Sequence, residues 1–165
     1  MNENIKNKII PDFFTAITVS FVVLVFDFIS HSFFTHPTAY IIFSSIAAST
    51  YILFIHRKSK FSIQRKFVIS YLLAYIGGIV GITIISYTGI FISLGISIIL
   101  VIVLMDLVDS DHPPAISLTF AFVLSDMELR ELYSILICMG IILALRYILD
   151  NYIIKDISKD LKRVI

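Results

Sequence analysis

Four long stretches of this chain contain no Asp, Glu, Lys or Arg, and they constrain its fold more than any other feature. They run over residues 13–26, 28–55, 67–105 and 112–125. A helix needs about 20 apolar residues to cross the hydrocarbon core of a bilayer. Of the 165 residues, 58% are hydrophobic and 15% are charged, whereas soluble domains average about 45–50% apolar and about 25% charged. The chain is therefore expected to be an integral membrane protein.

Apolar runs separated by polar or glycine-containing connections predict about six transmembrane helices. Their expected bounds are 12–30, 37–55, 67–87, 90–108, 113–126 and 131–154. The fifth has only about 14 apolar residues, so it is expected to be a half-helix, a tilted span or a re-entrant segment. We expect an all-α polytopic membrane domain over 12–154, with an N-terminal tail at 1–11 and a C-terminal tail at 155–165.

The distribution of Lys and Arg predicts which ends of the helices face the cytoplasm. Cytoplasmic loops collect these residues, and here they concentrate in the N-terminal tail, in residues 56–66 and in the C-terminal tail. Six crossings place all three segments on one side, with Arg130 on the other. We therefore expect both termini in the cytoplasm and, because transit features are absent, a prokaryotic plasma membrane. The basic segment 56–66 is interpreted as a solvated face, with binding of anionic lipid headgroups as the alternative.

Two segments of the chain resemble each other. HPTAYIIFSSIAAS begins at His36 and HPPAISLTFAFVLS begins at His112, with His, Pro, Ala and a final serine at the same offsets. The first follows span one and the second follows span four, so they would enter the membrane from opposite sides. This relation predicts a 3+3 inverted repeat over 12–87 and 90–154, an architecture of transporters with a site near the midplane. The alternative is that the two His-Pro pairs simply mark two helix starts.

The His-Pro motifs are candidate anion sites. Proline suits the first position of a helix, which places each histidine at the cap of a helix that begins at the following proline. A helix N-terminus presents unpaired N–H groups and a partial positive charge, and both favour anions. Two converging termini would bind a small inorganic anion. The predicted substrate-binding residues are His36, Pro37, Thr38, Ala39, His112, Pro113, Pro114 and Ala115.

Five ionisable residues are candidates for proton coupling, namely Asp27, His31, Asp106, Asp109 and Asp111. Ionisable groups in spans often mark proton relays. Asp27 falls within the first span, where His31 on the same helix face is its candidate partner; interfacial, solvated positions are the alternative. Asp111 has the alternative of capping the helix that follows. A third interpretation, metal binding by DLVDSDH, is weaker because these residues lie too close in sequence to supply a full coordination shell.

Other residues carry less functional information. Gly77 with Gly81, and Gly140 with Ala144, follow the small-xxx-small spacing of helix packing faces, within the bundle or in a homo-oligomer. The single cysteine, Cys138, cannot form an intramolecular disulfide. Because the chain lacks a zinc motif, a phosphate-binding loop and a nucleophile–base pair, we expect no cofactor, no metal and no enzymatic activity. A net charge of +1 gives no indication of nucleic-acid binding.

The segment around DHPPA resembles the signature of the HPP family of integral membrane proteins, named for the His-Pro-Pro carried here by residues 112–114. Residues 37–45 are similar to the family's first membrane motif, and residues 64–81 to its basic, glycine-containing entry into the next span. The resemblance covers about 30–155. The chain departs from the family pattern at Ile116, where glycine is usual, and it lacks a histidine near Tyr71 and prolines near the basic segment.

This resemblance implies a small-anion carrier or channel, since plant chloroplast and cyanobacterial members are associated with nitrite transport. It also implies about four spans, fewer than the hydropathy pattern predicts. Our leading hypothesis is transport of a small inorganic anion such as nitrite across the lipid bilayer, with proton coupling as an addition. The alternatives are a membrane sensor or binding subunit that does not transport and, with less support, an intramembrane enzyme that uses histidine and carboxylates as acid and base.

Overall fold

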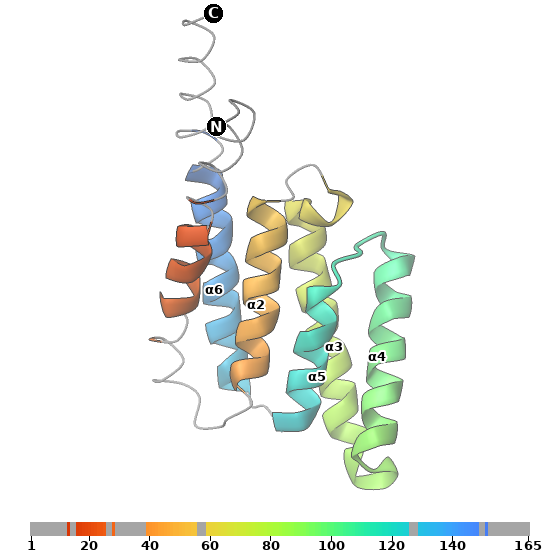
Figure 1. Ribbon diagram of the computed structural model, residues 1–165. Helices are drawn as coiled ribbons and strands as arrows, with labels where there is room; N and C mark the ends of the chain where they lie inside the picture. Colours follow the sequence, from red (N-terminus) through yellow and green to blue (C-terminus); the bar gives the residue numbers. More distant parts are fainter. Residues whose placement is uncertain are drawn as a thin grey trace, which may run out of the picture.

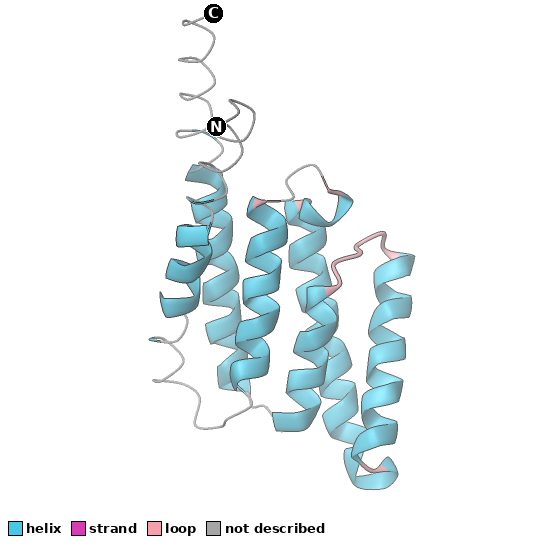
Figure 2. Cartoon of the chain, in the orientation of Figure 1, coloured by secondary structure: helices cyan, strands magenta, loops and turns pink. Residues whose placement is uncertain are grey.

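The computed structural model describes residues 13, 16–25, 28, 39–55, 59–125, 129–148 and 151. Within these residues all regular secondary structure is helical, which confirms the predicted all-α class (Figures 1 and 2). The labelled helices lie side by side with their axes roughly aligned (Figure 1). The tails expected at 1–11 and 155–165 lie outside the described residues.

A long apolar hairpin forms one part of the bundle. Helix α3 spans Gln64–Thr88 and α4 spans Ile90–Leu107, with Gly89 alone between them. Gly89 has a φ of 77°, a conformation that glycine adopts without the steric cost of a Cβ. At 1.5 Å per residue the helices are about 37 Å and about 27 Å long, comparable with a hydrocarbon core of about 30 Å. They are the two described helices that are long and apolar enough to cross a membrane.

The remaining helices are Ala16–Val25, α2 (Ala39–Phe54), α5 (Pro114–Ser125) and α6 (Leu129–Ile148), and η1 (Lys60–Ser62) is a short 3-10 turn. The predicted spans 37–55, 67–87, 90–108 and 113–126 coincide with α2 to α5 to within three residues at each end. Helix α5 has 12 residues and is about 18 Å long, so it is the short element that the sequence predicts. Six crossings and the inverted repeat stay predictions.

Helix α3 packs closely against both α4 and α5 because glycines line its contact face. A Cβ on Gly78 would lie 2.5 Å from the Cβ of Phe122 in α5. A Cβ on Gly77 or Gly81 would clash with side chains of α4 and α5. The predicted packing face at Gly77 and Gly81 is therefore used inside the bundle. Around Gly140 in α6, by contrast, no neighbouring helix of the described part of the chain comes within 4 Å of the position of a Cβ.

Candidate functional site

The stretch DSDHPPAIS, residues 109–117, contains the residues that terminate α4. Asp109 donates its N–H to the Asp106 carbonyl at 3.2 Å, and Ser110 donates its N–H to the Met105 carbonyl at 2.9 Å. This pair of bonds is a Schellman motif, which requires a left-handed residue after the helix. Asp109 is that residue, with a φ of 48°, and Asp tolerates this region better than most residues with a Cβ. Asp109 therefore stops α4 and turns the chain toward α5.

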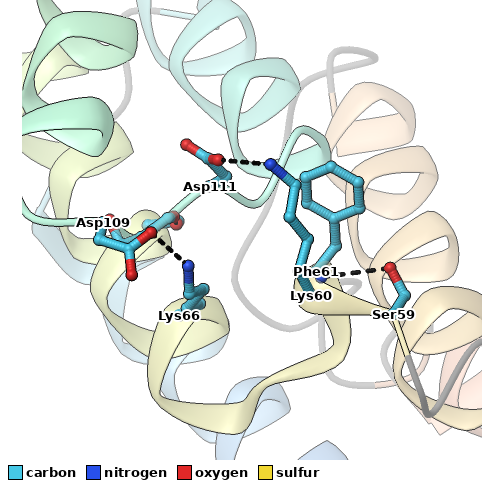
Figure 3. A network of polar contacts seen from close by, with 8 residues as sticks. Ser59, Lys60, Phe61, Lys66, Asp109 and Asp111 are labelled. Carbon is cyan, nitrogen blue, oxygen red and sulfur yellow. Dashed lines mark hydrogen bonds and ion pairs between the residues drawn. The ribbon is translucent and has the colours of Figure 1, made fainter.

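Two ion pairs join this connection to the basic segment (Figure 3). Lys66 Nζ in α3 lies 2.6 Å from Asp109 Oδ1, and Lys60 Nζ in η1 lies 3.2 Å from Asp111 Oδ2. The hydrogen bond from Lys66, together with its charge, holds the pKa of Asp109 below the ordinary value. Asp109 and Asp111 thus each have a lysine partner. Asp106, the third predicted acid on this side, is exposed.

The first N–H groups of α5 already have backbone partners. Pro113 and Pro114 carry no N–H, Ala115 donates to the His112 carbonyl at 3.0 Å, and Ile116 donates to the Pro113 carbonyl at 3.1 Å. These i→i+3 bonds form a tight first turn. The helix begins at Pro114, one residue later than expected. The predicted anion site relied on unpaired N–H groups, and the first turn of α5 offers none at these four residues.

His112 is buried in the bundle. Its Nδ1 lies 2.9 Å from the Phe61 carbonyl oxygen in η1, and its Nε2 lies 2.8 Å from Ser49 Oγ in α2. The ring of Phe67 meets the imidazole edge-on, with centroids 5.3 Å apart. Burial lowers the pKa of His112, and the hydrogen bond with the Phe61 carbonyl offsets part of this effect. Because both ring nitrogens have protein partners, a ligand would bond to the imidazole only by displacing one of them.

The contacts of His112 continue through three hydroxyl groups. Ser49 Oγ lies 2.8 Å from the hydroxyl of Tyr71, and Ser45 Oγ lies 2.9 Å from the same hydroxyl. Ser45 then donates to the Pro114 carbonyl at 2.6 Å. All of these side chains are buried. We call His112, Ser49, Tyr71 and Ser45 the hydroxyl chain; it links α2, α3 and the start of α5.

The start of α5 lies partway along α2 rather than at its end. Ser45, which contacts Pro114, is six residues beyond Ala39, the first residue of α2. Six residues correspond to about 9 Å along a helix axis. Helices α2 and α5 run in opposite directions, and α5 starts below the end of α2 (Figure 1). The two helix starts are therefore about 9 Å apart along the axis of α2.

The structure describes only part of the predicted site. It places His112, Pro113, Pro114 and Ala115 together at the start of α5, and it places Ala39 at the start of α2. Thr38, Pro37 and His36 lie outside the described residues, as do the proton-coupling candidates Asp27 and His31. Convergence of the two His-Pro motifs on one anion stays a prediction.

The site predicted from the sequence does not include Ser45, Ser49, Tyr71 or the carbonyl group of Phe61. A signal for the serines was present, because Ser45 and Ser49 are four residues apart and therefore share one face of α2. Tyr71 belongs to a face of α3 that also carries Phe67 and Ser70, all buried. The carbonyl of Phe61 gives no signal in the sequence, since any residue would supply it.

Comparison with known proteins gives one finding. Residues 5–160 match the family described as "HPP, transmembrane region". The matched range includes all the described residues and agrees with the resemblance at DHPPA. No curated protein and no solved structure matches the chain.

Proposed function

Because the chain belongs to the HPP family of membrane proteins, we propose that it transports a small inorganic anion such as nitrite together with a proton. The proposed site is the region where α5 begins, between α2 and α3. In many transporters a helix that starts partway through the bundle brings polar groups to a substrate near the midplane. Elsewhere in the described bundle many large hydrophobic side chains are exposed.

The observation that carries the proposal is the burial of His112 without an acidic partner among the residues that the structure describes. Its ring nitrogens bond a carbonyl and a hydroxyl, while Asp111, the adjacent acid, bonds Lys60 instead. A cation in a low-dielectric interior is costly unless an opposite charge accompanies it. A protonated His112 would therefore favour an anion close by, and the anion would favour protonation. Since Coulomb attraction is strong at low dielectric, the anion need not touch the ring.

A buried hydroxyl without a partner supports the same region. Ser110 Oγ, two residues before His112, has no hydrogen-bond partner among the described residues. Leaving such a group unpaired costs about 1–3 kcal/mol, and unpaired groups in native structures often correspond to a water or an ion. Because nitrite oxygens accept hydrogen bonds, we assign the Ser110 hydroxyl as a contact for the anion.

Uptake of nitrite, nitrate, chloride and formate into proteoliposomes tests the proposal. Measurements at pH about 5.5 and about 7.5 bracket the ordinary histidine pKa of about 6.5. We expect anion-selective uptake that is faster at the lower pH, is lost in His112→Gln and is weakened in Ser110→Ala. The matched control is Ser44→Ala, because Ser44 is an exposed serine of α2 whose one side-chain hydrogen bond among the described residues is to the Ile41 carbonyl of its own helix.

The same experiment separates the alternatives. No uptake of any anion by a folded protein would contradict transport and favour a sensor or binding subunit, for which a soluble partner of the basic segment is the next test. Equal uptake by wild type and His112→Gln would place the site elsewhere. The expected absence of enzymatic activity stays a prediction, and a hydrolytic or transfer activity retained in detergent would contradict it.

A further inference from the structure

The hydroxyl chain contains one proton too few when His112 is neutral. We propose that the hydroxyl chain is a proton-binding site. One proton added at His112 completes a line of hydrogen bonds that all point in the same direction and end at the Pro114 carbonyl. The hydrogen-bond geometry supports the proton binding. Its use for coupling to an anion rests on the proposed function.

The count follows from five short contacts. They join Phe61 O to His112, His112 to Ser49, Ser49 to Tyr71, Tyr71 to Ser45, and Ser45 to Pro114 O, at 2.9, 2.8, 2.8, 2.9 and 2.6 Å. Each contact needs one proton. A neutral imidazole has one N–H, and each of the three hydroxyls has one O–H. Four protons cannot fill five contacts, whichever way the hydroxyls rotate.

Neither neutral tautomer of His112 removes the shortage. With the proton on Nδ1, the Phe61 carbonyl is satisfied and Ser49 donates to Nε2, but Tyr71 then has one proton for two serines. With the proton on Nε2, the line from His112 to Pro114 is complete. Nδ1 then faces the Phe61 carbonyl, and both atoms are acceptors. The neutral chain therefore always leaves one contact without a proton.

The imidazolium removes the conflict. Nδ1–H donates to Phe61 O and Nε2–H donates to Ser49, which allows Ser49 to donate to Tyr71, Tyr71 to Ser45, and Ser45 to Pro114 O. Every donor then has one acceptor. The two carbonyls at the ends accept only, so they fix the direction of the line.

The surroundings set how strongly the proton binds. Burial opposes the charge and lowers the pKa of His112, and the completed chain offsets part of that effect. The charged groups of the neighbouring elements are Lys60 paired with Asp111, Lys66 paired with Asp109, and Arg146 of α6, which donates to the Ser62 carbonyl. The uncharged titratable groups are Tyr71 and, near it in α6, Cys138. Among these groups no carboxylate bonds the imidazole.

The test is an NMR titration of His112 in the full chain, with ¹⁵N-labelled histidine in lipid nanodiscs. The protein has four histidines, so the His112 signal is assigned by its loss in His112→Gln. The neutral tautomer with the proton on Nδ1 avoids two acceptors facing each other at Phe61, and in it Tyr71 can donate to Ser49 rather than to Ser45. In Ser45→Ala, Tyr71 therefore loses an acceptor that it needs when His112 is charged but not in this neutral tautomer, so the pKa of His112 is expected to fall by about 0.5–1 unit. This equals about threefold to tenfold weaker proton binding. Ser45 contacts Tyr71 rather than the imidazole, so a change in the pKa of His112 must be transmitted through the hydroxyl chain.

A double-mutant cycle makes the test stricter. Tyr71→Phe interrupts the chain and should lower the pKa by a similar amount, and adding Ser45→Ala to Tyr71→Phe should cause no further change. The matched controls are Ser44→Ala on α2 and Tyr75→Phe on α3. Tyr75 is one helical turn beyond Tyr71, and its ring packs on Phe122. Neither control should move the titration.

Two results would overturn the proposal: a His112 signal that does not titrate between pH about 4 and about 8, or a pKa that Ser45→Ala changes no more than Ser44→Ala does. These results are distinguishable from failure of transport. A shift in Ser45→Ala without anion uptake would support the proton site and contradict the proposed function. Uptake without the shift would do the reverse.

Discussion

The two halves of α3 are buried in different ways. The first half carries Phe67, Ser70 and Tyr71, large or polar side chains that meet α2, His112 and the connection before α5. The second half carries Gly77, Gly78 and Gly81, and the side chains of α4 and α5 fill the space where a Cβ would stand. The first half is held by hydrogen bonds and ring contacts, the second by close packing.

This difference separates function from architecture within one helix. A hydrogen-bonded half can respond to a proton or an anion, because its donors and acceptors have alternative arrangements. A glycine-packed half responds only to volume, because its contacts are steric. We therefore expect substitutions in the first half to change titration and transport, and those in the second half to change stability alone.

The largest expected effect on stability is that of His112→Ala. Removing the imidazole leaves the Phe61 carbonyl and the Ser49 hydroxyl unpaired and creates a cavity beside Phe67. We expect a loss of about 3–5 kcal/mol in the free energy of unfolding. Unfolding on heating can be followed with a thiol-reactive fluorophore, which reacts once Cys138 becomes exposed. Cys138 is the only cysteine of the protein and is buried in the folded state. A loss no greater than that of Ser44→Ala would contradict the structural role given to His112.

The next effect is that of Gly78→Ala in the glycine-packed half. The new methyl group would meet Phe122 Cβ, which cannot move without shifting α5, so we expect a loss of about 1–3 kcal/mol. The matched control is Gly95→Ala in α4, where no described residue outside its own helix lies within 4 Å of a Cβ. This substitution should stabilise the helix by about 0.5–1 kcal/mol. Similar melting temperatures for the two variants would show that α3 and α5 are not in the close contact described.

A smaller effect is expected from pH. Burial makes the folded-state pKa of His112 lower than the unfolded-state value of 6.5. Below pH 6.5 the unfolded chain therefore binds this proton more readily, and the stability present above that pH falls until the folded-state pKa is reached. Thermal unfolding in steps from pH about 8 to about 5 measures this loss. In His112→Gln this part of the pH dependence should disappear; an unchanged profile would assign it to another group.

The smallest effect on stability is expected for Lys66→Met, at the exposed connection between α4 and α5. Asp109 is fully exposed, so its ion pair with Lys66 is screened by salt. The folded-state pKa of Asp109 lies below 3.8, so the contribution of the pair is present above pH 3.8 and is lost as the pH falls through the lower value. Unfolding at low and high salt should show a slight loss in Lys66→Met at low salt only. A large loss at both salt concentrations would mean that the pair fixes the connection before α5.

The helices could be predicted from the sequence more fully than the site. Breaks in the apolar runs at the basic segment, at Gly89 and at Asp109–Pro113 are local signals, and the structure places helix ends there. The short span 113–126 was also predictable, because its length is visible in the chain. The site was not, because Ser45, Ser49, Tyr71 and His112 come from three separate parts of the sequence. Of these four, only His112 was predicted as a site residue, and for its helix cap rather than for its ring contacts.

An all-helical membrane protein of the HPP family, with a polar connection before a short helix, could be inferred from the order of residues alone. Apolar length, proline and charge act within one segment, so their effects are visible without a fold. The packing of the helices was needed to show that Asp109 ends α4 and pairs with Lys66, that Asp111 pairs with Lys60, and that His112 turns inward to Ser49 and the Phe61 carbonyl. These choices depend on which groups lie within about 3 Å, a distance that is set by the packing of α2, α3 and α5 on one another.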